Sequence, residues 1–167
     1  DLMVIVKDES IMQAKSLLDV ARGLESVHAF IEMPTIQFRL GRVFTSRDLI
    51  ALNVGATKMV KGEGIKVEAT PAFIQKMAEA ETEFFDDSGK QIQSAPLKNL
   101  MGHPFNAVLW LTQALKAQGK TLKKGDYISL GAVGRLFPLA NETRTYTYRI
   151  SGLAPTPIVS RVTVKSS

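Results

Sequence analysis

The sequence predicts a mixed α+β domain whose second half is rich in strands. Three observations lead to this prediction: apolar runs of strand-like composition near the start, helical segments that begin at capping residues, and a change to successive strands after Gly119. The chain has 167 residues, enough for one domain with a sizeable core. Its hydrophobic fraction of 45% and charged fraction of 22% are ordinary for a globular protein.

Three runs predict strands in the first 70 residues. Residues 2–6 and 27–33 are short and apolar, which is typical of buried strands. Pro34 ends the second run, because proline cannot donate a hydrogen bond to a neighbouring strand. Residues 65–69 alternate apolar and polar side chains and predict a brief third strand.

Two helices are predicted between these strands. Ser10 is expected to cap a helix that continues to Gly23. Thr45, followed three residues later by Asp48, resembles a capping box, in which each side chain accepts a hydrogen bond from the backbone of the other residue. This pair predicts a short helix through residues 49–52.

A third helix and a hairpin are predicted next. Thr70 followed by Pro71 is a strong helix start, since the cap precedes a proline at the first helical position. Residues 86–89, with the sequence Asp-Asp-Ser-Gly, form a turn pattern between two segments of strand composition. The predicted hairpin strands are residues 79–85 and 90–93.

The last third of the chain predicts one long helix and then strands. Apolar residues wrap most of the circumference of a helix at 105–118, so we expect it to be largely buried, with Trp110 in the core. His103 is interpreted as a residue that binds backbone where this helix begins. After Gly119, strands are predicted at 127–130, 144–150 and 158–164.

Composition excludes several kinds of site. The chain has no cysteine, which excludes thiol nucleophiles, thiolate metal sites and disulfides, and suits a cytoplasmic protein. Only two histidines occur, so a multi-histidine metal site is excluded as well. Any bound metal must therefore be held by oxygen ligands, which favours magnesium, calcium or manganese.

The patterns of charge and of apolar runs argue against two kinds of partner. The net charge is +5, but basic residues are interleaved with acids, and the densest cluster, Lys120, Lys123 and Lys124, has Asp126 beside it. Nucleic-acid binding needs a concentrated basic face, so no such partner is expected. No apolar run approaches the roughly eighteen residues of a membrane span.

Three motifs resemble those of a known enzyme group. Gly-His-Pro-Phe-Asn-Ala-Val-Leu-Trp-Leu at 102–111 precedes Leu-Lys-Lys-Gly-Asp-Tyr-Ile-Ser-Leu-Gly-Ala at 122–132. Phe30-Ile31-Glu32 with Pro34, and the turn Ser151-Gly152-Leu153, are the other two. Together they resemble the 2-keto-4-pentenoate hydratases and 2-oxo-3-hexenedioate decarboxylases of the fumarylacetoacetate hydrolase superfamily.

The resemblance implies a fold and a chemistry. The expected fold is a mixed β-roll with flanking helices, formed by a single catalytic domain over residues 1–167 whose N-terminal portion is missing. The expected activity is a hydro-lyase reaction that adds water to a small 2-keto-dienoate. The cofactor would be a divalent cation, Mg²⁺ or Mn²⁺, chelated by the substrate's carboxylate and 2-oxo group. A homo-oligomer is also implied.

The resemblance carries over to two metal ligands. Asp1 matches the second member of an acid-x-acid pair, and Glu32 matches a third ligand. The first member of the pair, and the family's lysine and acid/base aspartate, would lie upstream of Asp1. The catalytic residues therefore stay unknown.

Four residues are implied to lie near the substrate. Asn53 and Lys58 belong to the segment expected at the pocket, while Leu130 and Gly131 match a threonine-glycine pair of the family. Leu130 lacks the hydroxyl of threonine, and Asp1 is shorter than the usual glutamate. Arg135 is a further candidate partner for a substrate carboxylate, although a role outside the site is favoured.

Three alternatives stay open beside the hydratase. The same pocket design serves decarboxylation of a 2-keto diacid. Leu130 and Asp1 favour a non-catalytic member that acts as a binding or assembly module. The third alternative is a superfamily hydrolase that cleaves a carbon–carbon bond.

Overall fold

The computed structural model describes residues 1–35, 45–139 and 141–165. Helices and antiparallel strands both occur in these ranges, so the predicted α+β class is confirmed. The elements, in chain order, are β1 (Leu2–Val6), the 3-10 helix η1 (Glu9–Gln13), α1 (Leu17–Gly23), β2 (Leu24–Met33), α2 (Ser46–Ala51), η2 (Asn53–Gly55), β3 (Lys58–Lys66), α3 (Pro71–Glu79), β4 (Glu81–Phe85), β5 (Gln91–Pro96), η3 (Leu97–Asn99), α4 (Pro104–Ala117), β6 (Tyr127–Ser129), β7 (Arg144–Ser151) and β8 (Ile158–Val164).

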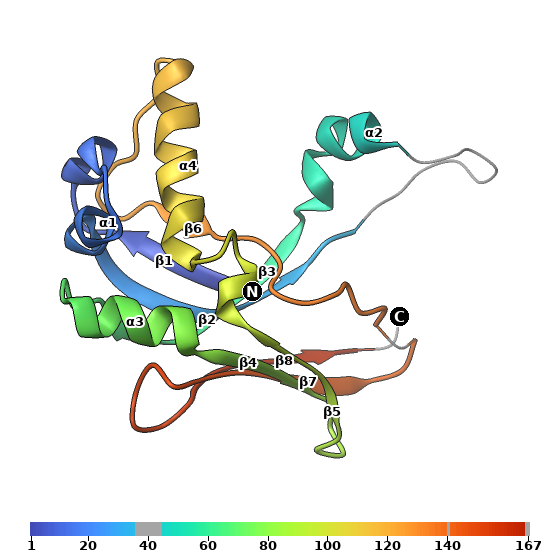
Figure 1. Ribbon diagram of the computed structural model, residues 1–167. Helices are drawn as coiled ribbons and strands as arrows, with labels where there is room; N and C mark the ends of the chain where they lie inside the picture. The colour runs from blue at the N-terminus through green and yellow to red at the C-terminus, as the bar shows by residue number, and fades with distance from the viewer. Residues whose placement is uncertain (36–44, 140, 166–167) are drawn as a thin grey trace.

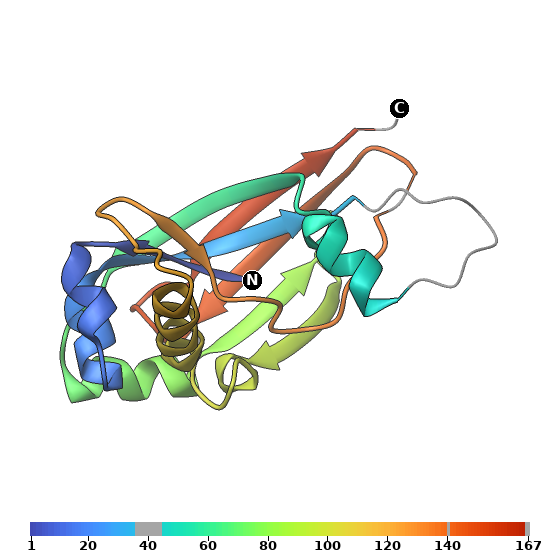
Figure 2. The ribbon, with the colours of Figure 1, turned by 90° about the horizontal axis from the view of Figure 1, so that it is seen from above.

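The strands of the described ranges form two four-stranded sheets. Their orders are β3-β2-β1-β6 and β5-β4-β7-β8, and all neighbouring strands are antiparallel. Figure 1 shows α1 and α4 on one side of the first sheet and the second sheet on its other side. Figure 2 looks down the axis of α4, which therefore stands up from the sheet instead of lying along it.

The two sheets meet where β3 runs against β8, which closes the strands into a roll. The hydroxyl of Ser160 donates to the carbonyl oxygen of Val60 (3.3 Å), and the backbone N–H of Val159 donates to the carboxylate of Glu63 (3.2 Å). Gly62 lies at the closest approach, because a Cβ placed there would come within 2.5 Å of the Cα of Ser160. The absence of a side chain at Gly62 is what allows the backbones to approach.

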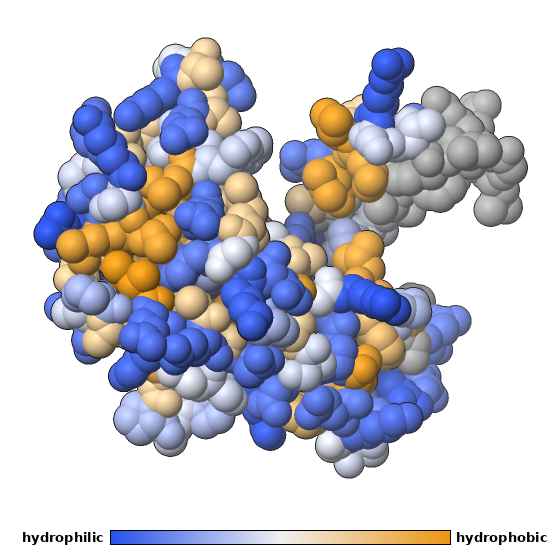
Figure 3. Space-filling view, in the orientation of Figure 1, coloured by the Kyte–Doolittle hydropathy of each residue, from blue (hydrophilic) through white to orange (hydrophobic). Residues whose placement is uncertain are grey.

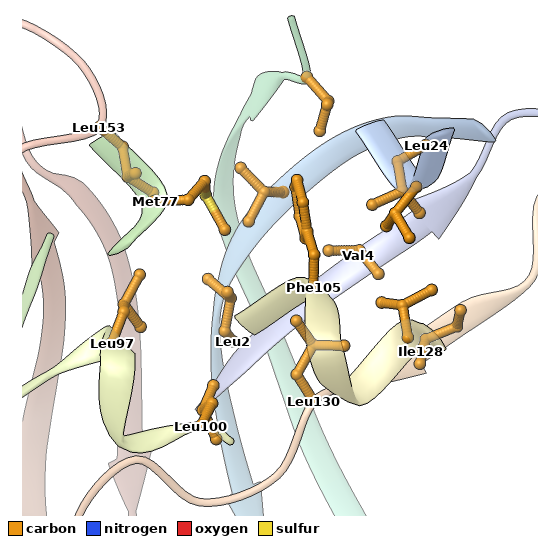
Figure 4. Close-up of a cluster of buried hydrophobic side chains, with 14 of the residues drawn as sticks. Leu2, Val4, Leu24, Met77, Leu97, Leu100, Phe105, Ile128, Leu130 and Leu153 are labelled. Carbon is orange, nitrogen blue, oxygen red and sulfur yellow. The ribbon is translucent and has the colours of Figure 1, made fainter. Parts of the chain in front are cut away.

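The main hydrophobic core lies between the first sheet and the helices. Figure 4 shows Phe105 of α4 projecting toward Leu2 and Val4 of β1, with Leu130 on the same side of the sheet. Phe105, Leu2 and Val4 are completely buried. Because side chains alternate along a strand, the opposite face of β1 and β2 is left to line the interior of the roll.

The predicted helix from Ser10 to Gly23 is wrong, since it is divided in two. The carboxylate of Asp8 accepts from the N–H of Ser10 (2.9 Å) and begins η1. Ser16 then caps α1, in a capping box with Asp19. Side chains that satisfy the free N–H groups at a helix start favour a new start at each of these positions.

The predicted strand at 65–69 is also wrong in its bounds, because β3 spans Lys58–Lys66. This strand contains Gly62 and Gly64. Glycine is uncommon in strands, so the sequence pattern does not predict a strand here. A Cβ at Gly64 would overlap the imidazole of His28, so both glycines are required by neighbouring groups.

Trp110 is not a core residue, which corrects its predicted burial. Its side chain is 60% exposed, whereas Phe105 and Val108 of the same helix are fully buried. The upright position of α4 explains the difference, because only one side of its N-terminal half contacts the sheet (Figure 1).

His103 is the N-cap of α4, as its predicted backbone-binding role requires. Its Nδ1 accepts from the N–H of Phe105 (3.0 Å), so Nε2 carries the proton and donates to the carbonyl oxygen of Ile74 (3.0 Å). Burial lowers the pKa of His103, while the bond to Ile74 opposes this shift. The ring therefore joins α3 to α4 in its neutral form.

The free energy of unfolding is expected to decrease as the pH falls below about 6.5, the ordinary pKa of histidine. In this window the unfolded chain binds more protons than the folded chain, because the folded pKa of His103 is lowered, so stability rises with pH. Urea denaturation between pH 5 and pH 8 measures the effect. His103→Asn keeps a capping side chain and should reduce the slope, leaving the contribution of His28, whose pKa burial also lowers. An unchanged slope in this variant would contradict the assignment.

No helix within the described ranges is both long and apolar enough to span a membrane.

Candidate active site

A cavity of about 560 Å³ lies inside the roll, within the range of about 300–1,000 Å³ typical of small-molecule sites. Strands β2, β4, β5, β7 and β8 and the loop at 132–139 line it, together with Asp1 before β1. Most lining side chains are apolar or aromatic. Three of them are charged, namely Asp1, Glu32 and Arg135.

A continuous row of cross-strand neighbours runs around the roll, and all of its members except Val60 and Ser160 line the cavity. The row runs from Ile31 to Val60, Ser160, Tyr148, Phe84, Gln93 and the backbone of Arg135. Each step is a strand pairing or a hydrogen bond, so residues far apart in sequence are held at one level. The site therefore depends on the closure of both sheets.

Asp1 and Glu32 reach the cavity from adjacent strands. The N–H of Phe30 donates to the carbonyl oxygen of Asp1 (3.2 Å), which places Asp1 opposite Phe30. Glu32 lies two residues beyond Phe30, on the same face of β2. Both residues line the same cavity.

These two carboxylates supply oxygen donors of the kind that hard divalent cations prefer. No group of three His, Cys, Asp or Glu side chains within residues 1–35, 45–139 and 141–165 could hold a metal ion by itself. Two carboxylates still provide four hard oxygen atoms, and Mg²⁺ usually keeps water or substrate oxygens as its remaining ligands. The donor set thus fits a hard divalent cation that is shared with a ligand.

The loop at 132–139 is held in place on both sides of Arg135. The N–H of Arg135 donates to Oε1 of Gln93 (3.2 Å), and Gly134 contacts the same side chain so closely that a Cβ would come within 2.5 Å of Nε2. Phe137 packs edge-on against Phe84 and Tyr146, with ring centroids 5.9 Å apart in both pairs. The loop is therefore anchored at Gln93 and at the aromatic cluster, and it forms one wall of the cavity.

Tyr148 brings a buried hydroxyl to the cavity wall. This hydroxyl has no hydrogen-bond partner in the part of the chain that the structure describes. Burial raises the pKa of Tyr148, and nearby Thr82 opposes the rise only in part, since its own hydroxyl donates to the carbonyl oxygen of Ala95 (2.7 Å). An unpaired buried hydroxyl costs about 1–3 kcal/mol, so a ligand oxygen that reaches Tyr148 would be favoured.

Comparison with solved structures identifies the fold. Over its full length the chain superposes on 4-oxalocrotonate decarboxylase from Pseudomonas putida G7 in complex with magnesium and adipate, with a TM-score of 0.76 and 17% identity. The chain has the 4-oxalocrotonate decarboxylase fold. The same enzyme in complex with calcium and acetate gives a TM-score of 0.73, also at 17% identity. The predicted β-roll with flanking helices is confirmed.

Sequence comparison agrees with this decarboxylase fold. The chain is 40% identical over 53 residues to a protein named TodF product hydratase from Pseudomonas putida F1, a match that covers 32% of this chain and 19% of the hydratase. No protein-family model matches the chain. It spans 59% and 58% of the two decarboxylase chains. In sequence and in fold, then, the chain resembles the hydratase and decarboxylase group.

Within this decarboxylase fold, the residues implied to bind substrate lie outside the cavity lining. Leu130 is buried in the core beside Phe105 (Figure 4), and Gly131 is exposed with a φ of +97°. Asn53 and Lys58 are exposed at the base of α2 and the start of β3. Ala132, directly after Gly131, is the first residue of its loop to line the cavity.

Helix α2 stands apart from the body of the molecule, which explains the position of Asn53. Figure 3 shows its apolar side chains gathered on a projecting segment, and Ile50, Leu52 and Val54 are all exposed. The segment is fixed at its base, where the N–H of Thr35 donates to the carbonyl oxygen of Gly55 (2.9 Å).

Sequence reasoning missed the aromatic wall of the cavity. Phe84 stacks on Tyr146 at 5.6 Å, and Tyr148 lies on the same face of β7. The alternation of Tyr146 and Tyr148 with polar residues was a usable signal, because it identifies one apolar face of a strand. The sequence does not say that this face borders a cavity rather than solid core.

Proposed function

We propose that this protein is a lyase that acts on a small 2-keto acid with the aid of a divalent cation. The observation that carries the proposal is the presence of Asp1 and Glu32 in one cavity with largely apolar walls. The names of the similar proteins, a hydratase and a decarboxylase in complex with magnesium or calcium, support the same chemistry.

Asp1 and Glu32 would hold the cation, with Mg²⁺ or Mn²⁺ preferred by their oxygen donors. A divalent cation there would supply a Lewis acid that polarises the carboxylate and 2-keto oxygens of the substrate. The aromatic wall of Phe84, Phe137 and Tyr146 would exclude bulk water and pack against the planar carbon chain.

Hydration of a 2-keto-dienoate is the first candidate reaction, supported by the local identity to a hydratase. Decarboxylation of a 2-keto diacid is the second, supported by the fold match to a decarboxylase. A non-catalytic family member is the third, since Asp1 is shorter than the glutamate usual in the family. By the same resemblance, we expect one catalytic domain, a homo-oligomer and a cytoplasmic location.

Magnesium is expected to stabilise the protein by about 2.7 kcal/mol at one hundred times its Kd, and Glu32→Gln should abolish this gain. The substitution keeps the shape of the side chain and removes the charge that holds the cation. Thermal unfolding with and without MgCl₂ measures the effect. Glu25→Gln is the matched control, because Glu25 lies exposed on the same strand and does not line the cavity.

Loss of the magnesium effect in Glu32→Gln but not in Glu25→Gln would support the metal site. An unchanged melting temperature of the wild-type protein in saturating magnesium and manganese would overturn it, and the non-catalytic alternative would then stand.

A further inference from the structure

The mouth of the cavity carries a run of exposed apolar side chains. Residues 136–139, with the sequence Leu-Phe-Pro-Leu, all line the cavity and are all exposed to solvent. Met33 and Pro34 line it from the end of β2 and are also apolar. A run of four exposed apolar residues favours aggregation, so it is uncommon unless the residues bind something. We call residues 136–139 the apolar rim of the cavity.

Phe137 connects the apolar rim to the interior of the cavity. Its ring packs edge-on against Phe84 and Tyr146, at 5.9 Å in both pairs, and those two rings stack on each other at 5.6 Å. Phe137 is 41% exposed, whereas Tyr146 is only 2% exposed. One apolar surface therefore extends from solvent at the rim to the buried inside of the roll.

The acidic residues of the cavity belong to the other sheet. Glu32 lies on β2 and Asp1 directly precedes β1, and both of these strands are in the first sheet. Phe84 of β4 and Tyr146 of β7 are in the second sheet. A ligand whose carboxylate is held through a cation at Asp1 and Glu32 therefore meets an apolar wall with the rest of its carbon chain.

The size of the cavity also favours a longer ligand. Its volume of about 560 Å³ is of the size that holds drug-sized molecules, so a five-carbon keto acid would leave much of it unfilled. Arg135 is the only lysine or arginine among the described residues that line it, and this residue is exposed. An exposed ion pair contributes little, because water and salt screen it. The remaining space thus suits an apolar carbon chain better than a second charged group.

We propose that the ligand is a 2-keto acid with an apolar tail of several carbon atoms, and that the apolar rim binds this tail. The inference rests on the proposed function, which assigns the carboxylate and the keto group to the cation. Binding removes the apolar surfaces of both the tail and the rim from water, and this is favourable in proportion to the area covered. Leu136 and Leu139 are thus specificity-determining residues of the site.

A series of unbranched 2-keto acids tests this inference. The probes 2-oxobutanoate, 2-oxohexanoate and 2-oxooctanoate differ only in the length of the tail. A fourth probe, 2-oxohexanedioate, has the length of 2-oxohexanoate and a second carboxylate. Their affinities are measured by calorimetry in saturating MgCl₂.

We expect each added methylene group to tighten binding to the wild-type protein by about threefold to fourfold. Over the four methylene groups of the series, 2-oxooctanoate should therefore bind at least about thirtyfold more tightly than 2-oxobutanoate. The diacid 2-oxohexanedioate should bind more weakly than 2-oxohexanoate, because its second carboxylate would lose water at an apolar surface.

Two double variants separate the apolar rim from other exposed apolar residues. Leu136→Ser combined with Leu139→Ser should reduce the gain to less than about twofold per methylene group and leave the affinity for 2-oxobutanoate unchanged. Ile50→Ser combined with Leu52→Ser is the matched control, because Ile50 and Leu52 are 76% and 41% exposed, as Leu136 and Leu139 are 77% and 42%, and lie outside the cavity. This control should keep the full dependence on tail length. Substitutions at such exposed positions should leave the fold intact.

The inference would be overturned if 2-oxooctanoate bound no more tightly than 2-oxobutanoate, if 2-oxohexanedioate bound more tightly than 2-oxohexanoate, or if the rim double variant kept the full dependence on tail length. Each of these results leaves the proposed function standing, because magnesium stabilisation is measured separately. If magnesium has no effect, the proposed function fails. The methyl ketones 2-butanone, 2-hexanone and 2-octanone, which have no carboxylate, then decide the role of the apolar rim through the same dependence on tail length.

Discussion

Phe105→Ala is expected to destabilise the protein by about 4 kcal/mol, because it empties the centre of the main core. Phe105 is fully buried, and Figure 4 places it over Leu2 and Val4 of β1. The helix that carries it stands upright, so few other side chains of α4 can fill the space. Urea denaturation at pH 7 measures the loss through the shift of the midpoint.

Trp110→Ala is the matched control on the same helix. Sequence pattern alone gives Trp110 a core position, yet its side chain is 60% exposed. Removal of the Trp110 indole, although it is larger than the phenyl ring of Phe105, should therefore lower the free energy of unfolding by less than about 1 kcal/mol. A loss for Trp110→Ala as large as that for Phe105→Ala would contradict the orientation of α4.

Gly62→Ala is expected to lower the free energy of unfolding by about 3 kcal/mol, at the upper end of the range for overpacked sites. The new Cβ would come within 2.5 Å of Ser160 Cα, and backbone atoms cannot rotate away as a side chain can. The roll would have to open between β3 and β8, so the proposed stabilisation by magnesium should fall together with the midpoint of urea denaturation.

Gly89→Ala provides the comparison for this glycine. Gly89 has a φ of +81°, but a Cβ there meets no atom within 4 Å. Its substitution should therefore cost only about 1 kcal/mol of backbone strain and leave binding unchanged. Equal effects of the two substitutions would show that β3 and β8 are not tightly opposed.

Local sequence signals predicted much of the fold. The capping box of Thr45 and Asp48 and the cap-proline pair Thr70-Pro71 are both found where expected, at the starts of α2 and α3. The turn at 86–89 also joins β4 and β5 as predicted. These signals are reliable because the side chains satisfy backbone groups within a few residues, so distant parts of the chain have little influence.

Features set by distant contacts were not predictable. The burial of α4 depends on the orientation of the helix relative to the sheet. The apolar pattern of the helix does not predict that orientation. Gly62 and Gly64 are unfavourable in strands, so the sequence does not predict β3 around them. The reason for both glycines is their close contact with Ser160 and His28, which only the structure shows. In both cases tertiary packing overrides the local preference of the residues.

The candidate site likewise contains residues that the sequence predicted and residues that it did not. Asp1 and Glu32, taken from the resemblance, line one cavity, and their role as metal ligands stays a prediction. Leu130 was predicted to lie near the substrate from its motif position, yet it follows β6 directly and its side chain is buried in the core. Tyr148 and Gln93 reach the cavity from strands that no motif marks.

The contact between Val60 and Ser160 joins residues 100 positions apart, and it closes the roll that contains the cavity. During synthesis, the ribosome must therefore release β8 before the ligand has a complete site to enter. Until then the inner face of β7, with its two tyrosines, lacks its neighbour and is exposed to other nascent chains. A ligand present during synthesis would therefore not protect the unfinished chain from aggregation. Binding can stabilise the protein only after β8 has docked against β7.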